Sequence, residues 1–136
     1  MDDKNLVQKE LIKKIVGDAR GAVGIRLCAI GVDLGIFKDL AKNGAATSQE
    51  LADRMGLDER YLREWGLGMF SLGYLDFNKV SRKISLNKEF IPVLVEEGGK
   101  FSQKGLIEIL NSSLLPYHEL LNSFKNGGGI NYDKID

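Results

Sequence analysis

The sequence predicts a mainly α-helical fold: a winged helix-turn-helix with a small β-hairpin wing, plus flanking helices. Two observations support this prediction. Residues 47–72 have the pattern of two short helices joined by a tight turn, and residues 74–86 have that of two short strands around a polar loop. Winged helices read DNA in regulators and serve as dimerisation or lid modules in some enzymes, so the fold alone does not give the function.

The N-terminal part predicts helices. Residues 4–16 interleave charges with an apolar set that predicts an amphipathic helix: Leu6, Val7, Leu11, Ile12, Ile15 and Val16. Residues 18–42 are more apolar. They predict one helix that breaks near Gly35, followed by a short helix 36–42 that ends at Asn43-Gly44.

Local chemistry sets the limits of the helix-turn-helix. Thr47 and Glu50 have the spacing of a capping box, and Gly56 can end the first helix in the left-handed conformation. Asp58 is suited to cap the second helix. Gly73 ends that helix, whose apolar positions recur at helical spacing: Tyr61, Leu62, Trp65, Leu67, Met69 and Leu72.

The wing is predicted as strands 74–77 and 84–86 around loop 78–83. Asn87 is expected to cap a turn that reaches Val95, and a break at 97–100 precedes helices 102–115 and 117–125, separated by Pro116. We therefore divide the chain into an N-terminal amphipathic helix (1–17), a winged-helix dimerisation domain (18–95) and a helical linker (96–136) that leads toward a catalytic domain absent from this chain.

Composition narrows the function classes. The chain has 136 residues, 43% of them hydrophobic, which suffices for one domain with its own core. Its 19 basic and 19 acidic residues give zero net charge, whereas nucleic-acid binders usually carry a basic excess. One cysteine, Cys28, excludes an intrachain disulfide and fits a reducing cytoplasm. We expect no signal peptide and no membrane span, hence a cytoplasmic protein.

A stripe of small residues runs along segment 17–35 with alternating spacings of four and three: Gly17, Gly21, Gly24, Cys28, Gly31 and Gly35. Each glycine destabilises a helix by about 1 kcal/mol relative to alanine, so the stripe implies a compensating close contact. Small residues allow two helix backbones to approach closely. The stripe is therefore a candidate dimer seam, and the alternatives are packing against a neighbouring helix of the same chain or simple helix interruption.

Five basic residues would contact DNA if the protein were a regulator: Arg60, Arg63, Lys79, Arg82 and Lys83. From Glu50 to Glu89, however, seven acidic residues balance seven basic ones. A winged helix that neutralises several phosphates should lean basic. We therefore favour a solvated surface at these positions, and nucleic acid is not an expected partner.

The sequence pattern identifies no catalytic, cofactor-binding or metal-binding residue. His118 has no cysteine or second histidine at ligand spacing, so it predicts no metal site. A general-base role for His118 is weaker than a structural one. Gly127-Gly128-Gly129 follows a predicted helix and lacks the GK[ST] sequence of a phosphate loop. Cys28, within an apolar helix, is expected to be a packing residue.

One family resemblance covers most of the chain. The phrase GIRLCAIGVDLGIFKDLAKNGAATSQELADRMGLDERYLREWGLGMFSLGYLDF resembles the N-terminal domain of a family of class I S-adenosylmethionine (SAM)-dependent methyltransferases. The matching residues are Leu34 to Phe37, Leu40-Ala41, Thr47, Glu50-Leu51-Ala52, Gly56-Leu57, Arg60-Tyr61, Arg63-Glu64-Trp65 and Gly73-Tyr74, then Phe124, Gly127-Gly128-Gly129 and Tyr132.

The resemblance implies a module that dimerises the parent enzyme and walls the pocket of a small-molecule methyl acceptor. Candidate wall residues are Tyr117, His118 and Tyr132. In the family, SAM sits on a glycine-rich loop after a strand of a following Rossmann-like domain, and this chain has no such loop. We expect an accessory domain or an expressed fragment that transfers no methyl group alone. The alternatives are a winged-helix DNA-binding transcriptional regulator and a stand-alone small-molecule sensor.

Overall fold

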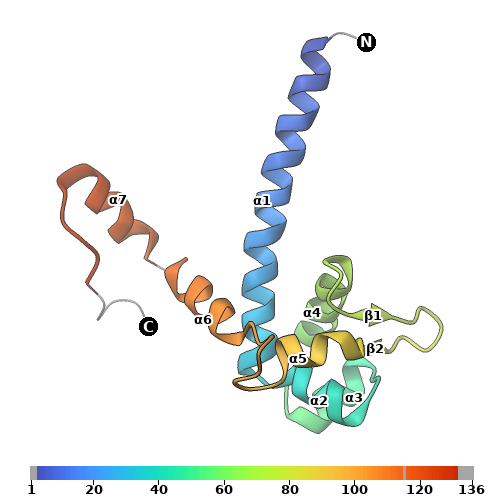
Figure 1. Ribbon diagram of the computed structural model, residues 1–136. Coiled ribbons are helices and arrows are strands. Elements are labelled where there is room, and N and C mark those ends of the chain that lie inside the picture. The colour runs from blue at the N-terminus through green and yellow to red at the C-terminus, as the bar shows by residue number, and fades with distance from the viewer. Residues whose placement is uncertain (1–2, 115, 132–136) are drawn as a thin grey trace.

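The structure is a computed structural model that describes residues 3–114 and 116–131. It confirms the predicted class, since helices dominate and one small antiparallel sheet forms the wing (Figure 1). The first half consists of α1 (Asp3–Asp33), α2 (Ile36–Asn43), α3 (Ser48–Met55) and α4 (Glu59–Ser71). The second half consists of β1 (Asp76–Phe77), β2 (Ile84–Ser85), the 3-10 helix η1 (Lys88–Phe90), α5 (Ile91–Leu94), α6 (Lys104–Ser113) and α7 (Tyr117–Asn126).

The helix α1 is continuous over 31 residues, about 46 Å at 1.5 Å per residue. It passes through Gly17, although the sequence predicts a separate helix over residues 4–16. A glycine weakens a helix without ending it, and no proline or cap intervenes. In Figure 1 the N-terminal half of α1 projects away from the other elements. All residues from 5 to 23 are exposed.

The helix-turn-helix has the predicted limits. Both hydrogen bonds of the capping box are present: Thr47 Oγ1 accepts from the N–H of Glu50 at 3.1 Å, and Glu50 accepts from the N–H of Thr47 at 2.8 Å. Gly56 ends α3 in the left-handed region (φ +68°). Asp58 caps α4 by accepting from the N–H of Tyr61 at 3.1 Å. Local side-chain chemistry therefore fixes both helix starts.

The wing is shorter than predicted. Its two strands pair Asp76 with Ser85 and Phe77 with Ile84. Tyr74 belongs to the end of α4 instead, because its N–H donates to the carbonyl of Met69 at 2.9 Å. Ile84 also exchanges two backbone hydrogen bonds with Ala46, of 2.9 and 3.0 Å. The wing is thus tied to the turn between α2 and α3.

The C-terminal elements follow the predicted order, with one helix shorter than predicted. Asn87 caps η1 by accepting from the N–H of Glu89 at 3.0 Å, which confirms the expected turn toward Val95. The helix expected over 102–115 is α6, ten residues long, and α7 follows Pro116. In Figure 1, α6 passes beside α1 and α7 extends outward. Among the described residues, no helix is long and apolar enough to cross a membrane.

The core lies where the C-terminal half of α1 meets α2, α3 and α4. Phe37 and Trp65 pack with ring centroids 5.5 Å apart. The indole N–H of Trp65 donates to the carbonyl of Leu27 at 2.9 Å, which joins α4 to α1. The most deeply buried side chains are Phe37, Ile36, Leu51, Met69 and Cys28.

Candidate functional site

The residues of the small-residue stripe do not share one environment. Gly24, Cys28 and Gly31 are buried by the chain's own residues. A Cβ atom at Gly31 would lie 2.5 Å from Phe37 Cε2 and 2.7 Å from Trp65 Cζ2. The close contact that glycine permits there is therefore made within the chain, which was one of the alternatives left open by the sequence.

The rest of the stripe lies elsewhere. Gly17 and Gly21 face open space, since a Cβ atom at either position would have nothing within 4 Å. Gly35 lies outside the helix, in the left-handed turn between α1 and α2 (φ +72°). A single chain does not test the predicted role of Gly17 and Gly21 in a dimer contact. The contact proposed below lies on the other side of α1.

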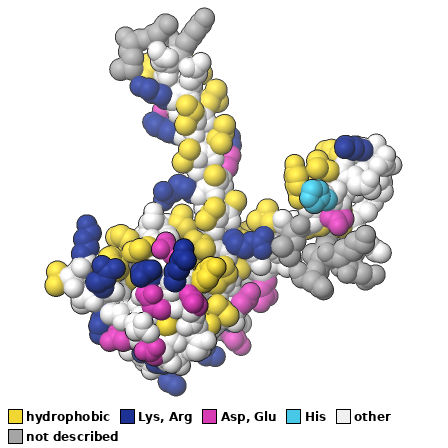
Figure 2. Space-filling model, turned by 180° about the vertical axis from the view of Figure 1, so that it is seen from behind, with side chains coloured by type: hydrophobic (Ala, Val, Ile, Leu, Met, Phe, Trp, Pro, Cys, Tyr) yellow, Lys and Arg dark blue, Asp and Glu magenta, His cyan; other side chains and the backbone are white. Residues whose placement is uncertain are grey.

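The opposite side of α1 carries large apolar side chains that are exposed to solvent. At 100° per residue, Ile15 lies about 180° around the helix from Gly24. Six exposed residues form what we call the apolar stripe: Leu11, Ile12, Ile15 and Ile30 on this side, with Val23 and Val16 at its edge, about 100° and 80° from Gly24. Ile15 is 68% exposed and Ile12 60% exposed. Figure 2 shows hydrophobic side chains along the whole projecting part of α1.

The five predicted DNA contacts lie on α4 and the wing, and carboxylates pair with two of them. Arg63 lies 3.5 Å from Glu59, and Lys83 lies 3.5 Å from Glu50. Glu50 also accepts the backbone N–H of Thr47, which, with Lys83, holds its pKa below the usual range. Arg60, Lys79 and Arg82 are exposed. A phosphate at this surface would meet carboxylates beside the cations, which weakens nucleic-acid binding.

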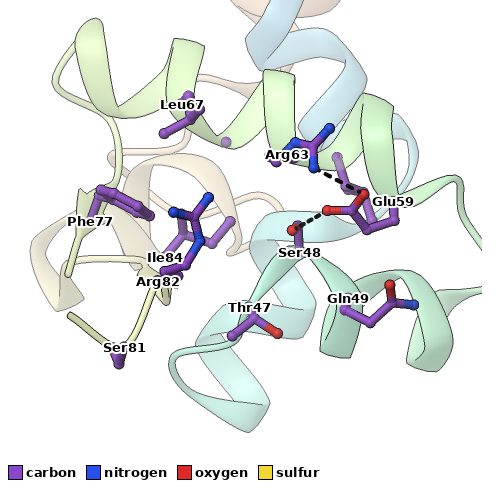
Figure 3. Close-up of a pocket in the computed structure, with 12 residues that line it drawn as sticks. Thr47, Ser48, Gln49, Glu59, Arg63, Leu67, Phe77, Ser81, Arg82 and Ile84 are labelled. Atoms are coloured by element: carbon purple, nitrogen blue, oxygen red, sulfur yellow. Dashed lines mark hydrogen bonds and ion pairs between the residues drawn. The ribbon is translucent and has the colours of Figure 1, made fainter. Parts of the chain in front are cut away.

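A groove separates α4 from the wing (Figure 3). Its volume is about 290 Å³. The apolar part of its lining includes Leu62, Leu67, Phe77 and Ile84, and Arg63 and Arg82 line it from opposite elements. The groove is not predictable from the sequence, because its walls come from segments that meet only in the folded chain.

One wall of the groove holds a carboxylate in place. Ser48 Oγ donates to Glu59 Oε1 at 2.6 Å, and the second Glu59 oxygen faces Arg63, as the dashed lines in Figure 3 show. This network joins the start of α3 to the first turns of α4. A serine and a glutamate eleven residues apart gave no recognisable signal in the sequence.

The predicted pocket-wall residues lie on α7, with one exception. His118 lines an open hollow of about 380 Å³ together with Glu119, Asn122 and Ser123. The Tyr117 ring is 5.9 Å from the His118 ring and is 62% exposed. Tyr132 lies outside the described residues. The structure therefore brings Tyr117 and His118 together at the surface.

Cys28 and the triple glycine lie in positions that fit structural roles. Burial raises the pKa of the Cys28 thiol, which contacts Tyr74 inside the core. The triple glycine follows α7, a helix, and Gly127 and Gly128 have φ of +74° and +82°. In the part of the chain that the structure describes, no three His, Cys, Asp or Glu residues are grouped to hold a metal ion.

Comparison with known proteins gives one family match. Residues 21–95 match the model of the Rv2258c-like winged HTH domain. This segment runs from the middle of α1 through the wing to the end of α5. No curated protein matches the chain.

Three solved structures share the fold. PigF with SAH matches with a TM-score of 0.68 and 18% identity over 84% of this chain and 33% of that one. The mitomycin 7-O-methyltransferase MmcR matches with a TM-score of 0.70 and 18% identity over 92% and 37%. An O-methyltransferase family 2 protein from Planctomyces limnophilus, in complex with apigenin, matches with a TM-score of 0.60 and 24% identity over 90% and 35%. The chain spans about a third of the length of these structures.

Proposed function

Because the chain belongs to the Rv2258c-like winged HTH domain family, we propose that it is an accessory domain of a SAM-dependent methyltransferase. In this role it joins two copies of the protein and contributes to the wall of the acceptor-substrate pocket. Its own residues perform no methyl transfer.

The methyltransferase part of the proposal is supported by the solved structures. Two of the three are named O-methyltransferases, and the third holds SAH, the product of SAM after methyl transfer. Between 84% and 92% of this chain superimposes on about a third of each of them. An accessory part of a larger enzyme that methylates small molecules is the role most consistent with that coverage.

The single observation that supports self-association is the apolar stripe of α1. An exposed branched side chain such as Ile15 or Val23 gains about 1.5–3 kcal/mol when it is fully buried. Contiguous exposed apolar surface of this kind marks interaction sites in soluble proteins. A second copy of the same helix offers a matching apolar surface, as a two-fold symmetric interface requires.

The pocket-wall part is supported by the position of α7. Tyr117 and His118 are exposed, and the apolar residues Leu120, Leu121 and Phe124 on the same helix are also open to solvent. Such a helix can cover an apolar substrate while the phenol and imidazole offer polar contacts. Gly127 to Gly129 then carry the chain away from this helix.

The residues of this chain do not fit SAM as a bound cofactor in the family's way. The family's cofactor loop follows a strand of a parallel sheet, whereas the sheet here is antiparallel with two-residue strands. The triple glycine follows a helix. We therefore expect SAM to bind a separate domain of the full-length protein.

Light scattering on the purified chain tests the self-association. The chain should have twice its monomer mass of 15.1 kDa, and Ile15→Glu should reduce the mass to that of the monomer. Helicity by circular dichroism should stay the same, because the Ile15 side chain is 68% exposed. Val80→Glu is the matched control, since Val80 is 95% exposed at the tip of the wing. An unmodified chain that stays monomeric at high concentration would contradict the proposal.

A further inference from the structure

The groove between α4 and the wing combines an apolar lining with two arginines. Leu67, Phe77 and Ile84 contribute the apolar part. Arg63 extends from α4, and Arg82 reaches from the wing toward α4 (Figure 3). The volume of about 290 Å³ is at the lower end of the range of small-molecule sites.

Of the two arginines that line the groove, only one has an acidic partner among the described residues. Glu59 faces Arg63 at 3.5 Å and is itself held by Ser48 at 2.6 Å, so Arg63 and Glu59 balance each other. Arg82 takes part in none of the ion pairs or side-chain hydrogen bonds found among the described residues. The ionisable side chains of the lining therefore sum to a single positive charge, which complements a monoanion.

The backbone at Arg82 gives an independent reason to look for a role of its side chain. Arg82 has a φ of +57°, and it is the one non-glycine residue with positive φ in the described part of the chain. Glycine or asparagine adopts this conformation at lower free energy than arginine. Asn78 fixes the loop by accepting from the N–H groups of Val80 and Ser81 at 2.9 and 3.0 Å. Residues held in such conformations cluster at ligand sites.

We propose that this groove binds a small organic monoanion with one carboxylate and one flat apolar ring. The planar guanidinium of Arg82 holds the carboxylate through two parallel hydrogen bonds. The ring packs against Phe77, Leu67 and Ile84. The site goes beyond the proposed function, because it uses no residue of α1 or α7. A DNA phosphate fits the groove less well, because it carries no apolar ring that could pack against this lining.

Titration of the ¹⁵N-labelled chain with benzoate, followed by NMR, tests this site. Saturable shifts are expected at the amides of Gly66, Ser81 and Arg82, with smaller changes elsewhere. Arg82→Gly should weaken benzoate binding by about tenfold or more. The same variant should keep or raise the melting temperature, because glycine adopts a positive φ without strain. Arg60→Gln, an exposed arginine on α4 outside the groove, is the control and should bind as the unmodified chain does.

Benzamide has the same ring as benzoate but no charge, so it distinguishes the contribution of the carboxylate from that of the ring. It should bind about tenfold more weakly than benzoate. The proposal is overturned by shifts that never saturate, by equal affinity for benzamide and benzoate, or by full binding to the Arg82→Gly variant. Stronger binding of inorganic phosphate or a DNA duplex at the same amides would also overturn it, and would reassign the groove to phosphate recognition.

Discussion

Gly31 on α1 lies directly against the ring of Trp65 on α4, so closely that a Cβ atom at Gly31 would come within 2.7 Å of Trp65 Cζ2. The same tryptophan donates its indole N–H to the carbonyl of Leu27, four residues earlier on α1. Glycine at this position is thus required by the packing of α1 onto α4. The contact fixes which side of α1 faces the core and which side is left to solvent.

Gly31→Ala should lower the free energy of unfolding by about 1–3 kcal/mol, because the new methyl group overlaps two aromatic rings. Gly21→Ala is the matched substitution on the same helix, and nothing lies within 4 Å of its Cβ position. It should raise helix stability by up to about 1 kcal/mol. Thermal and urea unfolding of both variants measure the difference. Equal effects of the two substitutions would show that the packing of Gly31 is looser than described.

Asp39 on α2 and Arg54 on α3 give a dependence of stability on pH. Arg54 Nε donates to both carboxylate oxygens of Asp39 at 3.1 and 3.0 Å, which holds the pKa of Asp39 below its ordinary value of 3.8. Since the folded pKa is lowered, the contribution is present above the unfolded pKa and is lost as pH falls through the folded one. Asp39→Asn should therefore destabilise the chain by about 0.5–1 kcal/mol at pH 7.

The difference in free energy of unfolding between the unmodified chain and Asp39→Asn should disappear in acid, below the folded pKa of Asp39. Urea unfolding at several pH values measures it. Asp76→Asn on the wing is the control, because Asp76 forms none of the ion pairs found among the described residues. A difference that stays constant into acid would assign the effect to packing rather than to charge.

DNA binding should be absent, or weak and non-specific, near physiological salt. The reason is the pairing of Arg63 with Glu59 and of Lys83 with Glu50 on the surface that would face DNA. A gel shift with genomic fragments checks this. A discrete complex that resists competitor DNA would favour the regulator over the enzyme domain.

The sequence predicts best the features that local chemistry determines. Thr47, Gly56 and Asp58 act on backbone groups within four residues of themselves, so their capping roles could be predicted and are observed. The wing was predicted too long, because the N–H of Tyr74 donates to Met69, at the end of α4, rather than to a strand partner. The alternation of apolar residues does not show whether a backbone N–H will bond to the preceding helix or to a strand partner.

The candidate surfaces depend on tertiary contacts and were harder to predict. The small residues of α1 were recognised from their spacing, but spacing does not tell whether the covering element belongs to the same chain. Phe37 and Trp65 cover Gly31, whereas Gly17 and Gly21 lie beyond the reach of the core. The groove beside Arg82 forms where α4 meets the wing loop, and the backbone conformation of that loop cannot be predicted from the sequence.

The proposed dimer contact through the apolar stripe of α1 can be tested most directly by scanning single cysteines along that helix. Cys28 is 1% exposed, so an introduced cysteine is the reactive one. Cysteines replace Ile12, Ile15, Val16 or Val23 on the stripe, and Gly17 or Gly21 on the small-residue side. Oxidation forms a disulfide only where two Cβ atoms approach to about 3.5–4.5 Å, near the two-fold axis. We predict a covalent dimer for at least one stripe position and none at Gly17 or Gly21. Cross-linking at Gly17 or Gly21 without any at the stripe would contradict this prediction and place the dimer on the small-residue side.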